Sequence, residues 1–399
     1  MGEPKLRFKA DDGSEFPAWE KKTLGDLGVF VRGLTYDKTQ TVETNGVAVM
    51  RSNNISSDGT LDYENGVQLV SKEPSEEQLL RKNDIVICMA NGSDRLVGKA
   101  AKYDGGYKEP SRITVGAFCG IFRSSAPALP WWFQSDEYQR FLYLGKQGGN
   151  GALANLKGKD IENISVIFPA DIDEQRKIAD CLSAVDAVIA AQQAEVDAWE
   201  QRKKGVMQKL FSQEVRFKAD DGSDFPDWTK TRLNKLCEYR TNRGTGRNYI
   251  GTENMLKDFE GVAVENGESE GTGSLYEPGD TLMSNIRPYL KKVWTADCEG
   301  ACSTDVLVFH PTNVVPDFLH YVIASDSFVT YVMSAAKGSK MPRGDKAHIM
   351  QMPVFAPDKD EQRKIADCLA SMDEVVQKSK GELAKWQELK KGLLQQMFV

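Results

Sequence analysis

The chain has 399 residues, of which 40% are apolar and 27% are charged. This composition is that of a folded globular protein, it excludes a disordered or fibrous chain, and the length predicts two or three domains. No run of apolar residues is long enough to predict a membrane span, and the net charge of −7 excludes a surface that is basic all over but not a local basic face.

The N-terminus and the cysteines predict the compartment. The first residues lack the basic and then apolar pattern of a secretory signal. The seven cysteines are an odd number, which predicts reduced thiols in the cytoplasm. Cys298 and Cys302 have no second pair at zinc-site spacing, so no metal site is predicted.

Two segments of the sequence occur twice. Residues 8–14, Phe-Lys-Ala-Asp-Asp-Gly-Ser, recur at 217–223, and each copy continues into Phe-Pro-x-Trp. Residues 173–182, Asp-Glu-Gln-Arg-Lys-Ile-Ala-Asp-Cys-Leu, recur at 360–369. The two offsets, 209 (217 − 8) and 187 (360 − 173), add up to 396, close to the chain length. We therefore predict a cyclic pseudo-dimer that is opened at one joint and has its two ends close together.

Each copy of the second segment opens a predicted helix. Apolar residues follow at steps of three, four or seven, which is the heptad stripe of a coiled coil. About 40 residues at about 1.5 Å each predict two rods of about 60 Å. The predicted core of the helix pair is Ile178, Leu182, Val185, Ile189, Val196, Trp199, Val206, Leu210, Ile365, Leu369, Met372, Val376, Leu383, Trp386, Leu393 and Met397.

These helices need partners because each would otherwise expose its apolar stripe. We predict an antiparallel intramolecular coiled coil that joins two globular domains; the alternative is a helical hairpin buried within one domain. The predicted division is a first globular domain at 1–172, a spacer helix at 173–212, a second globular domain at 213–359 and a second spacer helix at 360–399. The fold class is α+β.

The inserts between the repeated segments are predicted to be α/β heads. Short β-rich runs alternate with Asn-Gly, Asp-Gly and Gly-Gly turns. The runs are 46–50, 84–89, 113–122 and 164–168 in the first insert, and 249–250, 281–284, 306–309 and 352–355 in the second. A faint common pattern aligns Asn54 with Asn254 and Asp84 with Asp280, which predicts distant copies of one fold.

The sequence offers little that predicts catalysis. Residues 92–100 resemble a phosphate-binding loop, but five residues separate the glycines instead of four, and Ala100 replaces the magnesium-binding Ser or Thr. His310, His320 and His348 have no metal-ligand spacing, and no serine-nucleophile motif is present. An enzyme with an unrecognised site in the Gly92–Lys99 loop is the alternative interpretation.

Polar loops with local positive charge are the stronger signal. Each insert has three such loops, rich in Arg, Lys, Asn, Gln and Ser, at parallel places. These side chains supply donors for phosphates, and the forked or amide ones can also contact base edges in the major groove. Ordinary solvated loops are the plainer interpretation of any one of them.

The order of an unlike domain, a Glu-Gln-Arg-Lys-Ile-Ala helix opening, a second unlike domain and a matching helix resembles the specificity subunit of type I restriction–modification systems. The Phe-Pro-x-Trp segments and residues 279–282 and 285–291 are similar to segments of that family. The resemblance covers essentially the whole chain, and the doubled helix opening is its most specific part.

The resemblance implies a non-catalytic DNA-recognition subunit of a restriction endonuclease and adenine-methyltransferase complex. Each head would be a target-recognition domain that reads one half of a bipartite site in double-stranded DNA, and the helix pair would set the spacer between the halves. Two modification subunits would dock on the helices, and restriction subunits would join them in phage defence. S-adenosylmethionine, ATP and magnesium would be bound by those partners, with no cofactor in this chain.

The DNA-contact residues are expected in the polar loops. In the first insert they are Arg51, Asn53, Asn54, Asn91, Ser93, Arg95, Lys99, Gln147, Asn150, Asn155 and Lys157. In the second they are Arg243, Arg247, Tyr249, Asn254, Asn285, Arg287, Tyr289, Lys291, Lys337, Ser339, Lys340 and Arg343. The rival interpretation is an adaptor whose coiled coil docks proteins and whose inserts bind peptides.

Overall fold

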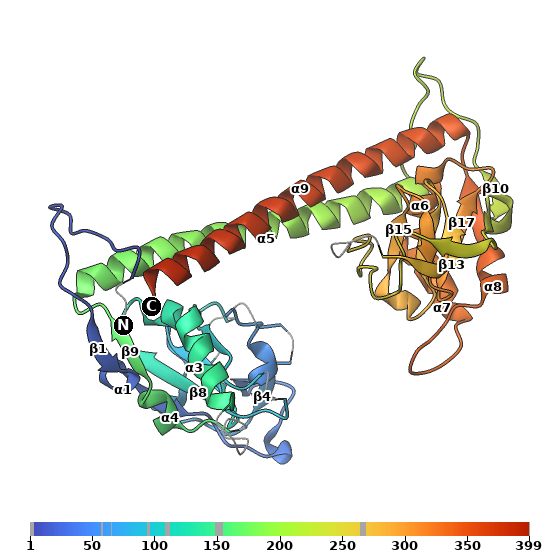
Figure 1. Ribbon diagram of the computed structural model, residues 1–399. Helices are drawn as coiled ribbons and strands as arrows, with labels where there is room; N and C mark the ends of the chain where they lie inside the picture. Colours follow the sequence, from blue (N-terminus) through green and yellow to red (C-terminus); the bar gives the residue numbers. More distant parts are fainter. Residues whose placement is uncertain are drawn as a thin grey trace. The chain divides into compact units, whose positions relative to one another are not determined.

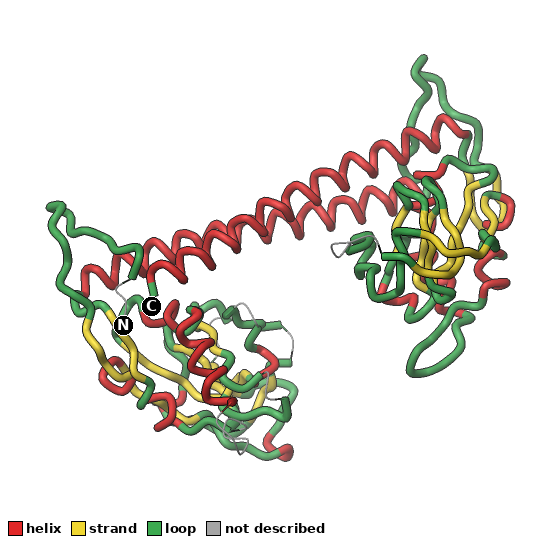
Figure 2. The backbone as a smooth tube through the Cα atoms, in the orientation of Figure 1, coloured by secondary structure: helices red, strands yellow, loops and turns green. Residues whose placement is uncertain are grey.

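The computed structural model describes residues 4–56, 59–64, 66–93, 96–107, 112–147, 155–263 and 269–398. They form two compact units: unit 1 contains the residues up to Ala194 and those from Gly381 onward, and unit 2 contains Glu195–Lys380. Each unit has a globular head of strands and short helices, and a part of each of two long helices (Figures 1 and 2). This mixture confirms the predicted α+β class.

The head of unit 1 is built around a four-stranded antiparallel sheet in the order β2-β8-β5-β6. A three-stranded sheet, β4-β3-β7, and the pair β1-β9 complete it. The strands are β1 Glu20–Thr23, β2 Gly28–Arg32, β3 Val47–Met50, β4 Gln68–Val70, β5 Ile85–Cys88, β6 Ala100–Lys102, β7 Ile113–Val115, β8 Cys119–Ser124 and β9 Ser165–Phe168. The helices are α1 Leu24–Leu27, α2 Leu129–Trp132, α3 Asp136–Gln147 and α4 Gly158–Glu162, with 3₁₀ turns η1 Lys38–Gln40, η2 Ser52–Asn54 and η3 Glu76–Gln78.

The head of unit 2 has an equivalent four-stranded sheet, but its three-stranded sheet is antiparallel throughout, whereas β3 and β7 of unit 1 are parallel. The four-stranded sheet of unit 2 has the order β11-β17-β14-β15, beside the sheet β12-β13-β16 and the pair β10-β18. The strands are β10 Thr229–Arg232, β11 Cys237–Tyr239, β12 Arg243–Gly246, β13 Gly271–Tyr276, β14 Thr281–Ser284, β15 Val293–Thr295, β16 Gly300–Cys302, β17 Val306–Pro311 and β18 Pro353–Ala356. The helices are α6 Pro316–Ile323, α7 Asp326–Ser334 and α8 Lys346–Met350, with 3₁₀ turns η4 Leu233–Lys235 and η5 Pro288–Leu290. The predicted run at 249–250 makes only an isolated bridge, between Ile250 and Cys302.

The two heads are copies of one fold, as the faint sequence pattern predicts. A buried aspartate precedes the central strand in both, Asp84 before β5 and Asp280 before β14. Each aspartate is paired with an arginine, but from different places: Arg123 lies on β8, whereas Arg240 follows β11. The buried aspartate therefore has an arginine partner in both heads, although the arginine comes from a different position in the fold.

The long helices α5 (Ile172–Phe211) and α9 (Lys359–Met397) pack antiparallel within each unit (Figure 1). In unit 1 the first turns of α5 share a core with the last turns of α9, through Leu182 and Met397. In unit 2 the last turns of α5 meet the first turns of α9, through Leu210 and Leu369. All sixteen residues of the predicted stripe are buried or partly buried. A hairpin within one domain is excluded, because each helix contributes to both units.

The repeated sequence segments form the same contacts in both units. In unit 1 the Arg7 guanidinium donates to both carboxylate oxygens of Glu174, from Nε at 2.9 Å and from Nη2 at 2.8 Å. In unit 2 Arg216 holds Glu361 in the same way, at 3.1 and 2.8 Å. Both glutamate side chains are completely buried. The segment that opens each repeat is thus fastened to the first turn of a long helix.

The chain is closed like a ring within unit 1. The backbone N–H of Leu6 donates to the carbonyl of Gln396 at 3.0 Å. In unit 2 the backbone N–H of Val215 donates to the carbonyl of Lys209 at 3.3 Å. The two bonds are equivalent, because Val215 is 209 residues after Leu6 and Gln396 is 187 residues after Lys209. Leu6 therefore lies after the end of α9 as Val215 lies after the end of α5, in agreement with the predicted cyclic arrangement.

We expect a circular permutant to fold, with the original ends joined by a short Gly-Ser linker and new ends between Gln213 and Glu214. The join needs no rearrangement, because Leu6 already takes the place that Val215 takes after α5. Circular dichroism and thermal unfolding should match those of the parent chain. A matched permutant opened inside α5, between Ala190 and Ala191, interrupts a helix and should melt about 10 °C lower. Equal melting of the two permutants would contradict the ring.

Candidate nucleic-acid interface

In both heads the loop after a central strand is tied to the loop before the last short helix. In unit 1 Ala90, after β5, forms an antiparallel bridge with Asn155, before α4. In unit 2 Ile286, after β14, forms the matching bridge with Arg343, before α8. Loops that the sequence predicts to contact DNA are therefore adjacent, at the same place in each head.

Unit 1 adds a third predicted loop to this cluster. The Asn91 side chain donates from Nδ2 to Oγ of Ser52 at 2.8 Å. The backbone N–H of Met89 donates to the carbonyl of Phe118 at 2.8 Å. The Phe118 side chain is 69% exposed at this place. Among the described residues, this surface combines amide and hydroxyl groups with the exposed ring of Phe118 and the exposed side chains of Arg51 and Lys157.

The cluster in unit 2 is richer in charge. Arg343 pairs with Asp305 at 3.2 Å, Lys337 with Asp345 at 3.1 Å, and Lys291 of the preceding loop pairs with the carboxylate of Asp326 at 2.7 Å. The ion pair with Lys291 lowers the pKa of Asp326, so that the aspartate stays charged. Ion pairs as exposed as these contribute little to stability, so the cations can exchange a carboxylate for a phosphate at small cost.

Arg287 has an unusual backbone conformation and a buried side-chain nitrogen. Its backbone is left-handed, with φ of 51°, and its N–H donates to the carbonyl of Pro342 at 2.8 Å. Among the described residues, the Arg287 Nε is buried without a hydrogen-bond partner. Lys291, at the other end of η5, is also left-handed, with φ of 55°. Non-glycine residues in this conformation store strain and concentrate at functional sites.

Three predicted contact residues support the loops instead of facing outward. The Asn54 side chain is fully buried, accepts from the N–H of Arg51 at 2.8 Å and donates to the carbonyl of Asp62 at 2.9 Å. Asn254 is partly buried, and its Oδ1 accepts from the N–H of Gly251 at 2.7 Å. The Asn285 side chain, 6% exposed, bonds both the N–H and the carbonyl of Gly344. Each of these side chains bonds the backbone of its own loop or of the loop bridged to it, so we assign these residues a structural role in place of the expected base contact.

The remaining predicted residues divide by position. Arg243 is on β12 of the three-stranded sheet, and Arg247 directly follows that strand, so neither is part of the bridged loops. Arg95, Asn150 and the side chain of Gln147 lie outside the described residues. The exposed members of the predicted set are Arg51, Asn53, Ser93, Asn155, Lys157, Arg243, Arg247, Tyr289, Lys337, Ser339, Lys340 and Arg343, and the partly buried ones are Asn91, Lys99, Tyr249, Arg287 and Lys291.

Two residues at the clusters, Phe118 and Asp305, were not predicted from the sequence. They precede β8 and β17, and each offers its carbonyl to the loop after the central strand, at Met89 and Asn285 respectively. Their equivalence follows from the offset of 187 residues that relates the helices (305 − 118), and this offset is the signal that could have identified them.

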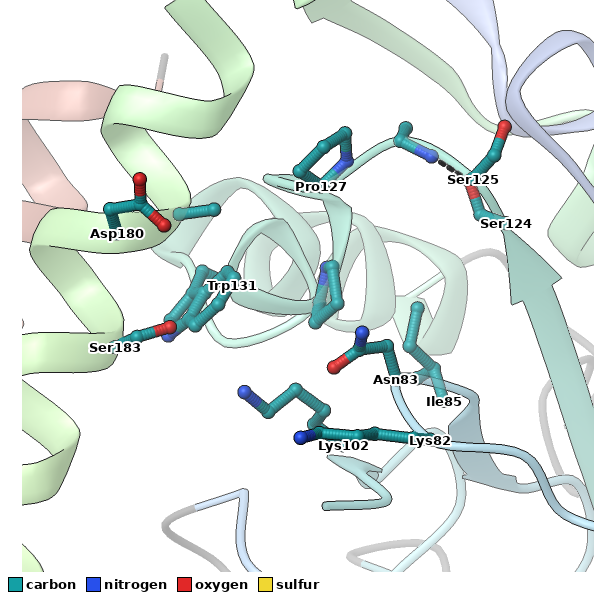
Figure 3. Close-up of a pocket in the computed structure, with 13 residues that line it drawn as sticks. Lys82, Asn83, Ile85, Lys102, Ser124, Ser125, Pro127, Trp131, Asp180 and Ser183 are labelled. Carbon is teal, nitrogen blue, oxygen red and sulfur yellow. Dashed lines mark hydrogen bonds between the residues drawn. The ribbon is translucent and has the colours of Figure 1, made fainter. Parts of the chain in front are cut away.

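A cavity of about 500 Å³ in unit 1 is lined by none of the predicted residues (Figure 3). It lies between the head and the first turns of α5, and its lining includes Lys82, Lys102, Trp131, Asp180 and Ser183. Within the described part of the chain, no group of three or more His, Cys, Asp or Glu side chains is arranged to hold a metal ion. No described helix has the length and apolar character of a membrane span.

Comparison with known proteins identifies the relatives of this chain. Residues 18–198 match the family described as type I restriction modification DNA specificity domain. The chain is 22% identical to the type I restriction enzyme EcoKI specificity subunit of Escherichia coli, over 95% of this chain and 88% of that protein. It is 23% identical to the putative MjaX specificity subunit of Methanocaldococcus jannaschii, over 97% and 94%. These matches confirm the resemblance seen in the sequence.

A solved structure has the same fold. The S subunit of the type I restriction–modification system of M. genitalium superposes with a TM-score of 0.58 over 100% of this chain and 99% of its own length. The two sequences are only 14% identical. The fold is therefore shared along the whole chain although most of the residues differ.

We expect Asn285→Ala to lower the free energy of unfolding by about 2 kcal/mol, because the N–H and carbonyl of Gly344 lose their buried partner. Ser339→Ala, in the exposed part of the neighbouring loop, should change it by less than about 0.5 kcal/mol. Urea unfolding followed by fluorescence measures both variants. If Asn285→Ala were as stable as the parent, the structural role of this side chain would be refuted.

Proposed function

We propose that each head contacts one half of a bipartite site in double-stranded DNA. The chain belongs to the specificity subunits of type I restriction–modification systems. The observation that carries this proposal is the pair of equivalent bridges, Ala90 with Asn155 and Ile286 with Arg343. They gather unlike loops at the same place on two copies of one fold. A duplicated scaffold with different loops is suited to reading two different sequences.

The chemistry of the two clusters supports unequal half-sites. Unit 1 offers the exposed amide of Asn155 and the exposed ring of Phe118. Unit 2 offers the guanidinium groups of Arg287 and Arg343 instead. Asparagine pairs best with adenine, arginine with guanine, and apolar side chains contact the thymine methyl group. The two heads therefore favour different bases.

We further propose that the long helices set the spacing between the half-sites. Each helix is continuous through both units, and its stripe packs against the other helix in each of them. Two reading heads on one face of a duplex need centres about one helical turn apart, roughly 34–36 Å. Helices of 40 and 39 residues are long enough to span that separation.

The chemistry of cleavage and methylation is proposed to lie on other chains. Two modification subunits would bind this chain and use S-adenosylmethionine, and restriction subunits would use ATP and magnesium. Because these subunits would assemble on DNA, the chain is proposed to act in the cytoplasm. This chain would determine the DNA sequence at which both activities act.

Exchange of residues 20–172 for the same insert of another specificity subunit should change one half-site and leave the other unchanged, because each loop cluster is built within one unit. Methylation mapping after co-expression with the modification subunits gives the result. The reciprocal exchange of residues 229–359 is the matched control and should change only the other half. A change in both halves after a single exchange would contradict independent reading. If no duplex is bound even with modification subunits present, an adaptor role is favoured.

Deletion of residues 191–197 together with 378–384 should shorten the spacer by about three base pairs. Seven helical residues correspond to about 10.5 Å, and a base pair to about 3.4 Å. Selection of bound sites from a pool with random spacers measures the change, and the half-site sequences should stay the same. Deletion of seven residues from α5 alone breaks the pairing of the stripes and is the matched control. An unaltered spacer in the double deletion would refute the role of the helices.

A further inference from the structure

We propose that Asp186 and Asp373 are positioning residues that fix the angle between each head and the helix pair, and that they thereby select the spacer length. The inference rests on the proposed function. In each unit one carboxylate joins three elements: the helix that carries it, the opposite long helix and the head.

In unit 2 the carboxylate is that of Asp373 on α9. Its Oδ2 accepts a hydrogen bond from the hydroxyl of Tyr321, on helix α6 of the head, at 2.7 Å. Its Oδ1 forms an ion pair with Lys203 of α5. The Tyr321 side chain is only 5% exposed, and burial, reinforced by the charge of Asp373, raises its pKa. The hydroxyl therefore remains a donor across the physiological pH range.

In unit 1 the carboxylate is that of Asp186 on α5. Its Oδ2 accepts from the indole Nε1 of Trp131, on helix α2 of the head, at 2.9 Å, and its Oδ1 pairs with Lys390 of α9 at 2.7 Å. Trp131 is 3% exposed and lies beside α5, with the Lys102 ammonium 4.3 Å from its ring centroid (Figure 3).

The comparison of the two units argues that this contact is more than ordinary packing. Asp186 and Asp373 differ by 187 residues (373 − 186), as do Lys203 and Lys390 (390 − 203), so the helices present the same pair to each head. The donors do not correspond: Trp131 aligns with position 318 of unit 2, three residues before Tyr321. One head donates from an indole and the other from a phenol one helical turn later, and both reach the same carboxylate. The contact has been kept although the residue that makes it has changed.

The geometry explains how such a contact can act on DNA recognition. A hydrogen bond to a charged acceptor is directional and stronger than one between neutral groups, so it resists rotation of the head about the helices. The ion pair between Lys204 and Asp326 also joins α5 to the head in unit 2, but it is half exposed and weakened by solvent. The hydrogen bonds to Asp186 and Asp373 are partly buried, and their loss leaves the apolar core intact. The angle between head and helices can then vary, which changes the separation of the half-sites that the heads can reach together.

The test uses Tyr321→Phe, which keeps the ring and removes only the donor, and Asp186→Asn, which keeps an acceptor but removes the charge that Lys390 pairs with. The variants, purified with modification subunits, select duplexes from a pool with random half-sites and spacers. We expect at least a fivefold loss of preference for the best spacer over spacers one base pair longer or shorter, with unchanged half-site sequences. Tyr331→Phe, in the same head but stacked on His348, is the matched control and should behave as the parent.

Folded variants that keep the parent's spacer preference would overturn the positioning role. An altered half-site sequence would also overturn it, because the residues would then act on base reading. If the parent chain itself selects no bipartite site, the proposed function fails, which separates that outcome from failure of this inference. Asp186→Asn keeps the question decidable if Tyr321→Phe does not fold.

Discussion

A bidentate ion pair between an arginine that precedes each head and a glutamate in the first turn of each long helix is the interaction on which the arrangement depends. Arg7 holds Glu174, and Arg216 holds Glu361. Both carboxylates are fully buried, and a buried charge that loses its partner costs several kcal/mol. The segment before each head therefore cannot separate from the helix after it. The heads could diverge because this junction, and not the head, specifies where the chain enters and leaves.

The two junctions are not identical in their details. Trp228 donates from Nε1 to Glu361 at 3.0 Å, and the side-chain carbonyl of Gln362 accepts from the N–H of Val315 at 2.8 Å. In the described part of unit 1 the corresponding atoms, Nε1 of Trp19 and Oε1 of Gln175, are buried without a hydrogen-bond partner. Unsatisfied buried groups of this kind cost free energy. The junction of unit 1 is therefore the weaker of the two, although the sequences of the frames are nearly the same.

The long helices and the duplication could be predicted from the sequence because both rest on regular spacing. The apolar stripe defines α5 and α9, and the two offsets define the ring. The bridges between Ala90 and Asn155 and between Ile286 and Arg343 could not be predicted, since they depend on how the loops leave the sheets. Asn54 and Asn285 were expected to contact DNA because asparagine suits base edges, but the same amide also suits a buried turn, and only the fold distinguishes these uses. Trp131 and Tyr321 were missed because they occupy different positions in the two heads.

The identical decapeptide at the start of α5 and α9 has a consequence for how such a protein can diversify. Any head that ends before this decapeptide and begins after an Arg-Phe-Lys segment meets the same glutamate, the same arginine and the same heptad stripe at either junction. Recombination at the segments that encode these repeats can therefore replace a whole head while the arginine–glutamate pair of the junction is restored. New combinations of half-sites can arise in one genetic event, without a series of unstable intermediates.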